Sequence, residues 1–338
     1  MSRTRLSKTI ALMLLAGTAL SQPARADSTA ELSVGGLVVA RTADLAIESQ
    51  ELTIAIDEVR IRYKFLNQSA NPITATVSFP LPDIDLSEAD NYAIPSTDPV
   101  NFLDFKTTVD GKPVTFTISQ RALLGDKDIS AKIKAAGLPI LPIGTRQDSV
   151  ARLPPEAKER LLGEGLLIPA GTDAKGNALH AGSWTVKTSA VRQQTFPAGK
   201  PVMIEHRYRT SMGVSFDTIL RKGLRENAAM AAEVNRYRTA YCIGDDLLRG
   251  IDRIAGDAEG NVAGLRERRI VHLMKGGVGN PPMPIKDLRI VVDKGKPDRL
   301  VSFCLDNVAK ISPTSFEIRM KDYTPDRDLK ILLIGKLD

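Results

Sequence analysis

The sequence predicts a mainly β (α+β) protein, built of antiparallel β-sandwich-like layers with a helical insertion and a second β-rich half that carries one long helix. Apolar and polar side chains alternate over successive short stretches between Leu52 and Phe79 and again after residue 183. A period of two indicates strands with one buried face, as in antiparallel sheets packed against a second layer. Helical spacing is confined to residues 122–182 and to a region near 216–238.

Residues 1–26 have the form of a secretory signal peptide. Three basic residues precede an apolar run at Ile10–Leu20, and Ala24-Arg25-Ala26 resembles a signal peptidase site. The run is shorter than the roughly 20 residues that span a bilayer. We therefore expect an exported, periplasmic protein whose mature chain has no transmembrane segment.

Removal of the expected signal peptide would lower the net positive charge of the chain. The whole chain has 46 basic and 40 acidic residues, and four of the basic residues lie in the expected signal peptide. The mature chain would keep 42 basic against 40 acidic residues, a net charge of +2. Nucleic-acid binding needs a concentrated basic face, so no nucleic-acid partner is expected.

Residues 27–121 are expected to form an antiparallel β region. The apolar parity flips between Ile56 and Val59, which fits either a tight hairpin that opposes Ile54 to Ile61 or a bulge in one long strand. Val59–Phe65 is expected to pair with Ile73–Phe79.

A second hairpin is expected at Leu103–Ile118, turning at Asp110-Gly111. That register opposes Phe105 to Phe116, and it places Pro113 at a sheet edge.

Residues 122–182 are expected to be a helical insertion and a loop. Helices are predicted at Asp128–Ala136 and Pro154–Gly163, and a loop at Leu166–Gly182.

Residues 183–338 return to a β-rich pattern. A long helix is predicted at Phe216–Arg238 and a short one at Asp245–Ile254. Strands are predicted at Trp184–Phe196, Val202–Tyr208, Arg266–Met274, Leu288–Val292, Leu300–Leu305, Phe316–Met320 and Leu329–Ile334.

The two cysteines, Cys242 and Cys304, both lie in the expected mature chain. In an oxidising compartment a lone pair is most simply a disulfide, and two free buried thiols are the alternative. A disulfide between them would close a loop of about 60 residues, and it would contribute about 4 kcal/mol to stability in the chain-entropy model.

Candidate site residues are few. His206 shares the parity of Ile204 and Tyr208 and should face the core, whereas Glu205 faces the other way. A core histidine with satisfied nitrogens is the simplest interpretation, and ligand binding by His206 and Glu205 is the functional one. No catalytic residue can be assigned.

An acidic cluster containing Asp83, Asp85 and Asp90 follows one predicted strand. Calcium prefers such oxygen ligands, but the cluster lacks the glycine and the final glutamate of an EF-hand loop. We expect a solvated acidic loop and no cofactor, with a calcium site as the alternative.

Several motifs resemble one bacterial exported family, catalogued as domain of unknown function 4424. They are Asp27-Ser-Thr-Ala-Glu-Leu, Gly35-Gly36-Leu37, Val59-Arg-Ile-Arg-Tyr-Lys-Phe-Leu-Asn67 running to Phe79-Pro-Leu-Pro-Asp83, Gln194-Thr-Phe-Pro-Ala-Gly199, Glu205-His-Arg-Tyr208, Tyr241-Cys242 and Thr324-Pro-Asp-Arg-Asp328. The resemblance covers essentially the whole mature chain. It implies export and a β-rich fold, and it supplies no activity and no catalytic residues.

The leading hypothesis is a non-enzymatic envelope protein that binds an unidentified envelope protein or ligand, or serves as a scaffold. A periplasmic hydrolase or modifying enzyme with a site around His206 is one alternative. A calcium-dependent adhesive module is the other, because the first strands are also similar to the β-sandwich that precedes von Willebrand-type domains.

Overall fold

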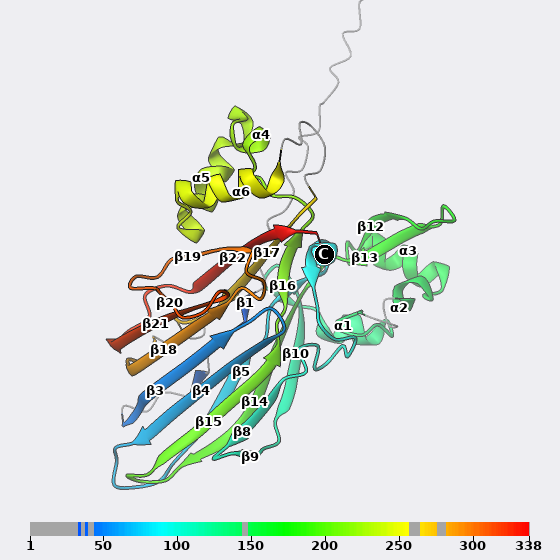
Figure 1. Cartoon of the computed structure of the whole chain (residues 1–338). Coiled ribbons are helices and arrows are strands. Elements are labelled where there is room, and N and C mark those ends of the chain that lie inside the picture. The colour runs from blue at the N-terminus through cyan, green and yellow to red at the C-terminus, as the bar shows by residue number, and fades with distance from the viewer. Residues whose placement is uncertain are drawn as a thin grey trace, which may run out of the picture.

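The computed structural model describes residues 33–34, 38–39, 44–143, 148–256, 264–275 and 282–337. The expected signal peptide at residues 1–26 lies outside these ranges. Within them the chain is mainly β with few helices, and most neighbouring strands run antiparallel, as the alternating pattern predicted. Two sheets lie face to face, with helices on two sides of them (Figure 1).

The larger layer is an eight-stranded sheet, which we call the front sheet. Its order is β20 (Ala309–Lys310), β21 (Ser315–Tyr323), β18 (Ile285–Asp293), β3 (Leu45–Ile54), β4 (Glu58–Asn67), β15 (Pro201–Arg209), β8 (Lys106–Val109) and β9 (Lys112–Pro113). All neighbours are antiparallel except β18 and β3, which run parallel. In β4 every second side chain from Val59 to Phe65 is buried, and alternate positions such as Arg60 and Lys64 are exposed. The strand therefore presents one face to the interior and one to solvent.

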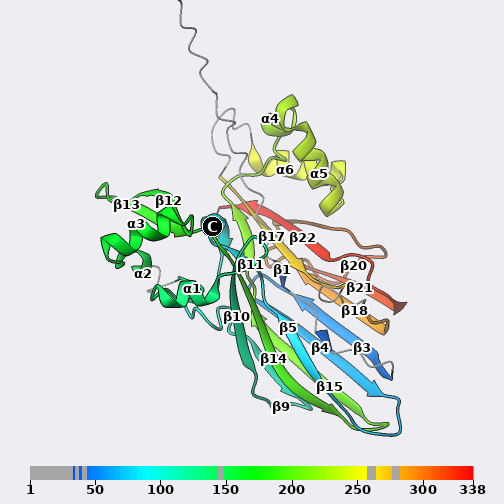
Figure 2. The ribbon, with the colours of Figure 1, turned by 180° about the vertical axis from the view of Figure 1, so that it is seen from behind.

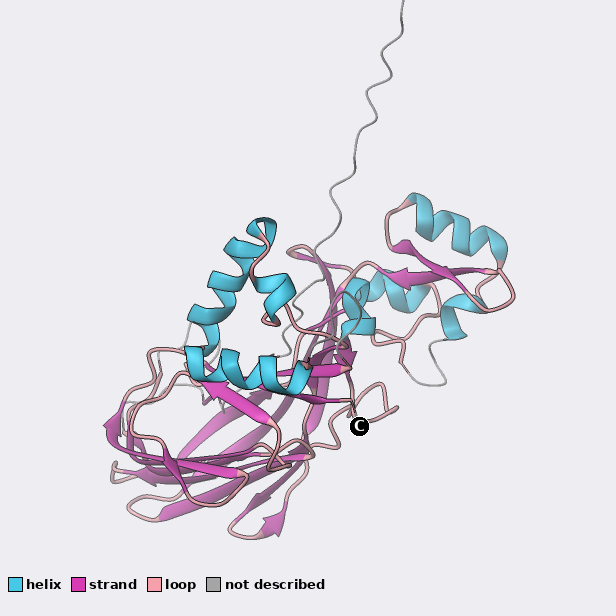
Figure 3. Cartoon of the chain, turned by 45° about the horizontal axis from the view of Figure 1, so that its top comes forward, coloured by secondary structure: helices cyan, strands magenta, loops and turns pink. Residues whose placement is uncertain are grey.

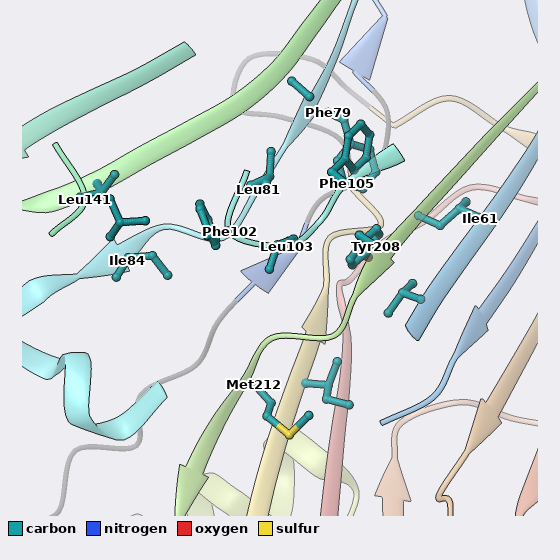
Figure 4. Close-up of a cluster of buried hydrophobic side chains, with 14 of the residues drawn as sticks. Ile61, Phe79, Leu81, Ile84, Phe102, Leu103, Phe105, Leu141, Tyr208 and Met212 are labelled. Carbon is teal, nitrogen blue, oxygen red and sulfur yellow. The ribbon is translucent and has the colours of Figure 1, made fainter. Parts of the chain in front are cut away.

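The second layer, the back sheet, is seen from behind in Figure 2. It contains β11 (Lys127–Asp128), β10 (Thr117–Leu124), β14 (Thr185–Phe196), β5 (Ile73–Pro80) and β2 (Val38–Val39) in that order, with β6 (Ile84–Asp85) also paired to β14. Apolar side chains from both sheets belong to one buried cluster. Within it the rings of Phe79 and Phe105 stack at 4.9 Å, close to Tyr208 and Ile61 (Figure 4). Burying each such side chain contributes about 1.5–3 kcal/mol to folding.

The parity flip after Ile56 is explained by a hairpin between β3 and β4. Ile54 pairs with Val59 and Leu52 with Ile61, and the Ala55 amide donates a hydrogen bond to the Glu58 carbonyl at 3.0 Å. This register is two residues away from the expected one. A shift of two leaves every side chain on its expected face, which is why the inward pattern was still correct.

The expected pairing of β4 with β5 is wrong. β4 pairs with β15, and β5 pairs with β14 in the other sheet. Residues 68–72 therefore carry the chain from the front sheet to the back sheet, and residues 197–200 return it. Alternation fixes which side chains point inward, but a short connection can join strands of one sheet or of two opposite sheets.

The expected hairpin at Leu103–Ile118 is only half present. β8 and β9 pair in the predicted register, Thr108 with Pro113, and β9 is the outermost strand of the front sheet. Pairing does not continue, because the next strand, β10, joins the back sheet beside β14. The rings of Phe105 and Phe116 still meet at 5.2 Å. Phe116 thus lies where the chain crosses between the sheets.

A third sheet adjoins the sandwich. It contains β19 (Leu300–Phe303), β22 (Leu329–Lys336), β17 (Leu265–His272), β16 (Met212–Ser215), β7 (Tyr92–Ala93) and β1 (Ser33–Val34), the last paired with β17. The five strands that were predicted after residue 265 are confirmed, and they are β17, β18, β19, β21 and β22. Helices α5 (Ala231–Tyr241) and α6 (Asp245–Ala255) pack against it (Figure 3).

The single helix expected at Phe216–Arg238 is wrong in its extent. The segment forms α4 (Lys222–Arg225), a 3₁₀ turn at Ala228–Met230 and α5. Asn227 separates them, and its side chain accepts a hydrogen bond from the Ala229 amide at 2.9 Å. Asparagine favours such caps over helix interiors.

The cysteines form the expected disulfide. Cys242 follows α5 and Cys304 follows β19, with Cα atoms 5.1 Å apart and a sequence separation of 62 residues. The bond ties the helices to the third sheet.

The insertion projects from the side of the sandwich (Figure 1). It contains α1 (Ser130–Ala135), α2 (Asp148–Ala151) and α3 (Pro155–Gly163), and a 3₁₀ helix at Leu86–Asn91 lies before it in the chain. The loop expected at Leu166–Gly182 is instead a hairpin of β12 (Leu167–Thr172) and β13 (Ala178–Gly182). Asp173 accepts hydrogen bonds from two backbone amides in its turn, an Asx-type arrangement that the sequence reading overlooked.

Among the described residues, none of the helices has both the length and the apolar character needed to cross a bilayer.

Asn67 holds the first crossing between the sheets. Its side chain is fully buried, and its amide nitrogen donates to the Asn71 carbonyl at 2.8 Å and to the Phe196 carbonyl at 2.9 Å. Its oxygen accepts from the Ser69 amide at 3.0 Å. One side chain thus links the crossing at residues 68–72 to the end of β14, where the crossing at 197–200 begins.

We predict that Asn67→Ala lowers the free energy of unfolding by about 3 kcal/mol, because buried carbonyl and amide groups lose their partners. Urea unfolding monitored by circular dichroism measures this. The neighbouring exposed change Gln68→Ala serves as the control and should cost less than about 0.5 kcal/mol. Equal losses in the two variants would contradict the role given to Asn67.

Candidate ligand site between the sheets

The inner row of β15 places His206 in the middle of the sandwich. Its neighbours in that row are buried, and His206 itself is 2% exposed. The ring centroids of Phe79 and Phe105 lie 5.0 and 5.2 Å from that of the imidazole. The side chain faces the core, as its parity predicted.

A small hollow lies beside the imidazole. We call it the inter-sheet hollow, and it is lined by Val77, Phe79, Phe105, Thr107, Phe116, Ala190, Arg192 and His206. The centre of a water molecule can occupy about 10 Å³ of this hollow. The hollow therefore has room for about one water molecule. Of the lining residues, only Phe116 and Arg192 are half-buried and the others are buried. The solvent side of the hollow is therefore the side of Phe116 and Arg192.

Polar atoms without hydrogen-bond partners gather at this hollow. They are Thr107 Oγ1, Arg192 Nη2 and both ring nitrogens of His206, none of which bonds to another described residue. Thr107 and His206 are 5% and 2% exposed. Buried polar groups in proteins are nearly always paired, so a group of unpaired ones at one place requires a physical explanation.

Arg192 brings a positive charge to the hollow. Its Nη1 donates to the side-chain oxygen of Gln194 and, at 3.5 Å, to the Gln193 carbonyl. Both acceptors are neutral, and no carboxylate occurs among the lining residues. Burial lowers the pKa of Arg192. The guanidinium remains charged at any physiological pH, because arginine side chains are not deprotonated in proteins.

Burial, and secondarily the charge of Arg192, lowers the pKa of His206 from 6.5 to about 3. The ring is neutral near pH 7 and offers one donor and one acceptor. Such a low pKa makes it a weak general base, so hydrogen bonding is the role that its position favours.

Glu205, the other residue of the sequence-derived pair, lies on the opposite face of β15. It pairs with Arg62 at 3.1 Å and lies 4.0 Å from Arg60 on the solvent side of the front sheet. The structure therefore does not bring Glu205 and His206 together at one site.

The acidic cluster is engaged in ordinary surface contacts. Asp83 pairs with Lys187 at 2.6 Å, and Asp85 accepts hydrogen bonds from the Ser87 amide and hydroxyl at 2.9 and 2.7 Å. The side chain of Asp90 lies outside the described part of the structure. Within the described residues no three histidine, cysteine, aspartate or glutamate side chains form a metal-binding group.

The other histidines lie elsewhere. His180 is half-buried on β13 in the insertion, and His272 is buried on β17. His272 Nδ1 lies 3.5 Å from the Tyr208 hydroxyl, and burial lowers the pKa of His272 to about 4. Neither lines the inter-sheet hollow.

Sequence reasoning missed Arg192 and Thr107. The signal was present, because Arg192 shares the parity of Val186 and Phe196, whose side chains are buried. A charged residue in an inward-facing row of a strand is unusual and points to a functional position. Thr107 gave a weaker signal, since threonine is common on both faces of a sheet.

The low pKa of His206 predicts a pH dependence of stability. The unfolded histidine takes up a proton below pH 6.5 and the folded one does not until about pH 3, so the histidine's contribution to stability falls as the pH drops through this window. From pH 7 to pH 5 the loss should be about 2 kcal/mol for this one group. His206→Gln should lose correspondingly less in urea unfolding over the same interval. Identical losses in the wild-type and variant proteins would contradict the buried neutral imidazole.

Comparisons with known proteins identify a family and give no information on the inter-sheet hollow. A family model described as Domain of unknown function (DUF4424) matches residues 25–332. No curated protein matches the chain significantly. A crystal structure of a candidate nutrient binding protein from Legionella pneumophila is similar over 90% of this chain and 71% of its own, with 11% identity and a TM-score of 0.43.

Two structures of M1 zinc metallopeptidase from Deinococcus radiodurans are similar at 7% and 8% identity, each with a TM-score of 0.24. They cover 86% and 87% of this chain, which spans only 42% and 43% of theirs. At these values none of the three structures assigns an activity. The family match extends over nearly the whole chain, and on that basis the protein belongs to the DUF4424 family.

Proposed function

We propose that this chain is an exported, periplasmic protein that binds a small ligand in the inter-sheet hollow and does not transform it. The observation that carries the proposal is the set of polar atoms of Thr107, Arg192 and His206 that border one hollow without partners. Binding sites typically place a few polar groups in an apolar pocket. A ligand that supplies acceptors would pair with the donors among these groups, which are Arg192 Nη2, the Thr107 hydroxyl and the one N–H of the His206 ring.

Binding is favoured over catalysis by the chemistry of the lining. Among the described residues that line the hollow, the only hydroxyl is that of Thr107, and there is no carboxylate to orient or activate it. A threonine nucleophile needs a neighbouring base, and a histidine whose pKa is about 3 is a poor one. The hollow therefore has donors for holding a ligand and lacks the paired acid and base of a hydrolase.

Export is supported by two independent features. The first 26 residues have the composition of a signal peptide. The disulfide between Cys242 and Cys304 suits an oxidising compartment such as the periplasm.

The proposal predicts a trade-off between stability and binding at Thr107. Removing an unpaired buried hydroxyl with Thr107→Val should raise the free energy of unfolding of the ligand-free protein by about 1 kcal/mol. The same change should weaken the binding of small ligands to the hollow. Half-exposed Thr108 on the same strand gives the control Thr108→Val, which should alter neither property.

Urea unfolding measures the stability, and the panel for binding consists of benzoate, benzamide, hexanoate and hexanamide. Binding is followed by the His206 ring resonances in NMR titrations of the full mature chain. Saturable shifts from at least one compound, weakened in the Thr107→Val protein, are expected. If neither these four compounds nor sodium bromide shifts these resonances, or if Thr107→Val destabilises the ligand-free protein, the proposal is overturned.

A further inference from the structure

We propose that the ligand of the inter-sheet hollow presents a single negative charge to Arg192. This inference rests on the proposed function and names the chemical class of the ligand. The charge can belong to the carboxylate of a small apolar acid or to a monatomic halide. Both would offer an acceptor to the donors of Arg192, Thr107 and His206.

The first argument is charge balance. Arg192 borders a hollow lined by three phenylalanine rings, a valine and an alanine, and no Asp or Glu is among the lining residues that the structure describes. Within the part of the chain that the structure describes, the guanidinium bonds to two neutral oxygens, those of Gln193 and Gln194. Arg192 is half-buried, and its Nη2 atom is shielded from water without a hydrogen-bond partner. Burying a charge costs free energy unless the charge is paired. An anion would neutralise Arg192, whereas a cationic ligand would be repelled and a neutral one would leave the charge unpaired.

The second argument is the kind of hydrogen-bonding group present. Arg192 Nη2 is a donor only, the Thr107 hydroxyl can donate, and the neutral His206 ring has one N–H. A carboxylate accepts through two oxygens, and so can receive all three donors. Hydrogen bonds between a charged donor and a carboxylate are about twice as strong as neutral ones.

The third argument is size. The hollow has room for about one water molecule, which is close to the size of a monatomic ion or of one carboxylate oxygen. The body of a larger acid would occupy the place of Phe116. That residue is half-buried and lies in the connection between β9 and β10, outside both strands. The aromatic lining suits an apolar body behind the charged group.

Paired titrations of the mature protein test the inference. Sodium benzoate is compared with benzamide and sodium hexanoate with hexanamide, because each pair has the same body and differs in charge. The dissociation constants come from the His206 ring resonances at constant ionic strength. We expect each acid to bind about 10- to 100-fold more tightly than its amide. A sodium bromide arm identifies the source: competition with benzoate shows that a bare halide suffices, and no competition shows that a carboxylate is needed.

Variants locate the charge that is responsible. Arg192→Gln should weaken benzoate binding by about 10- to 100-fold, and Arg192→Lys should restore most of the loss. Arg207→Gln is the matched control on β15, because Arg207 pairs with Glu58 on the exposed face at 2.8 Å. It should leave binding unchanged. Melting temperatures establish that each variant is folded, and the comparison of acids with amides in the wild-type protein stands without any variant.

The outcomes separate the two proposals. Amides that bind as tightly as their acids would overturn the anionic ligand and leave a ligand site in place. No shift of the His206 resonances with acids, amides or bromide would overturn both, and the hollow would then be a site for a single ordered water. Acid binding that Arg192→Gln does not weaken would also overturn the inference.

Discussion

The structure depends on the burial of two inner sheet faces against each other. β4 and β15 supply the central rows of the front sheet, and β5 and β14 supply those of the back sheet. Two of the short connections between the sheets are at 68–72 and 197–200. Asn67 hydrogen-bonds to Asn71 in the first and to Phe196, the residue before the second. Because one fully buried amide links them, the spacing and the register of the two layers are set together.

This arrangement explains which parts of the fold could be predicted. The period of two correctly identified the inward side chains of β4, β5 and β15, because alternation is a local property of a strand. It could not identify the partner strands, because a connection of four to six residues spans either a hairpin or a crossing between layers. The register of β3 and β4 was wrong by two residues for a related reason, since a shift of two preserves every face.

The predicted boundaries of the helix at Phe216–Arg238 were wrong for a different reason. The stripe of apolar residues after Phe216 is real, but Asn227 competes for backbone hydrogen bonds and divides the segment. The disulfide needed only the count of cysteines and the expected compartment. The site could be predicted only in part, because His206 drew attention as a rare residue type. Arg192 was hidden in a strand that was correctly predicted, and its meaning depends on a neighbouring sheet that sequence does not place.

The account therefore rests on one unusual feature of the core, a guanidinium that faces the interior beside unpaired polar atoms and without a carboxylate in the lining. A crystal structure of the mature protein grown with sodium benzoate tests this most directly. We expect density for the carboxylate within hydrogen-bonding distance of Arg192 Nη2 and Thr107 Oγ1, with Phe116 displaced by the ring. Density for a water alone in the hollow, with the Arg192 guanidinium turned to a surface carboxylate, would contradict the account.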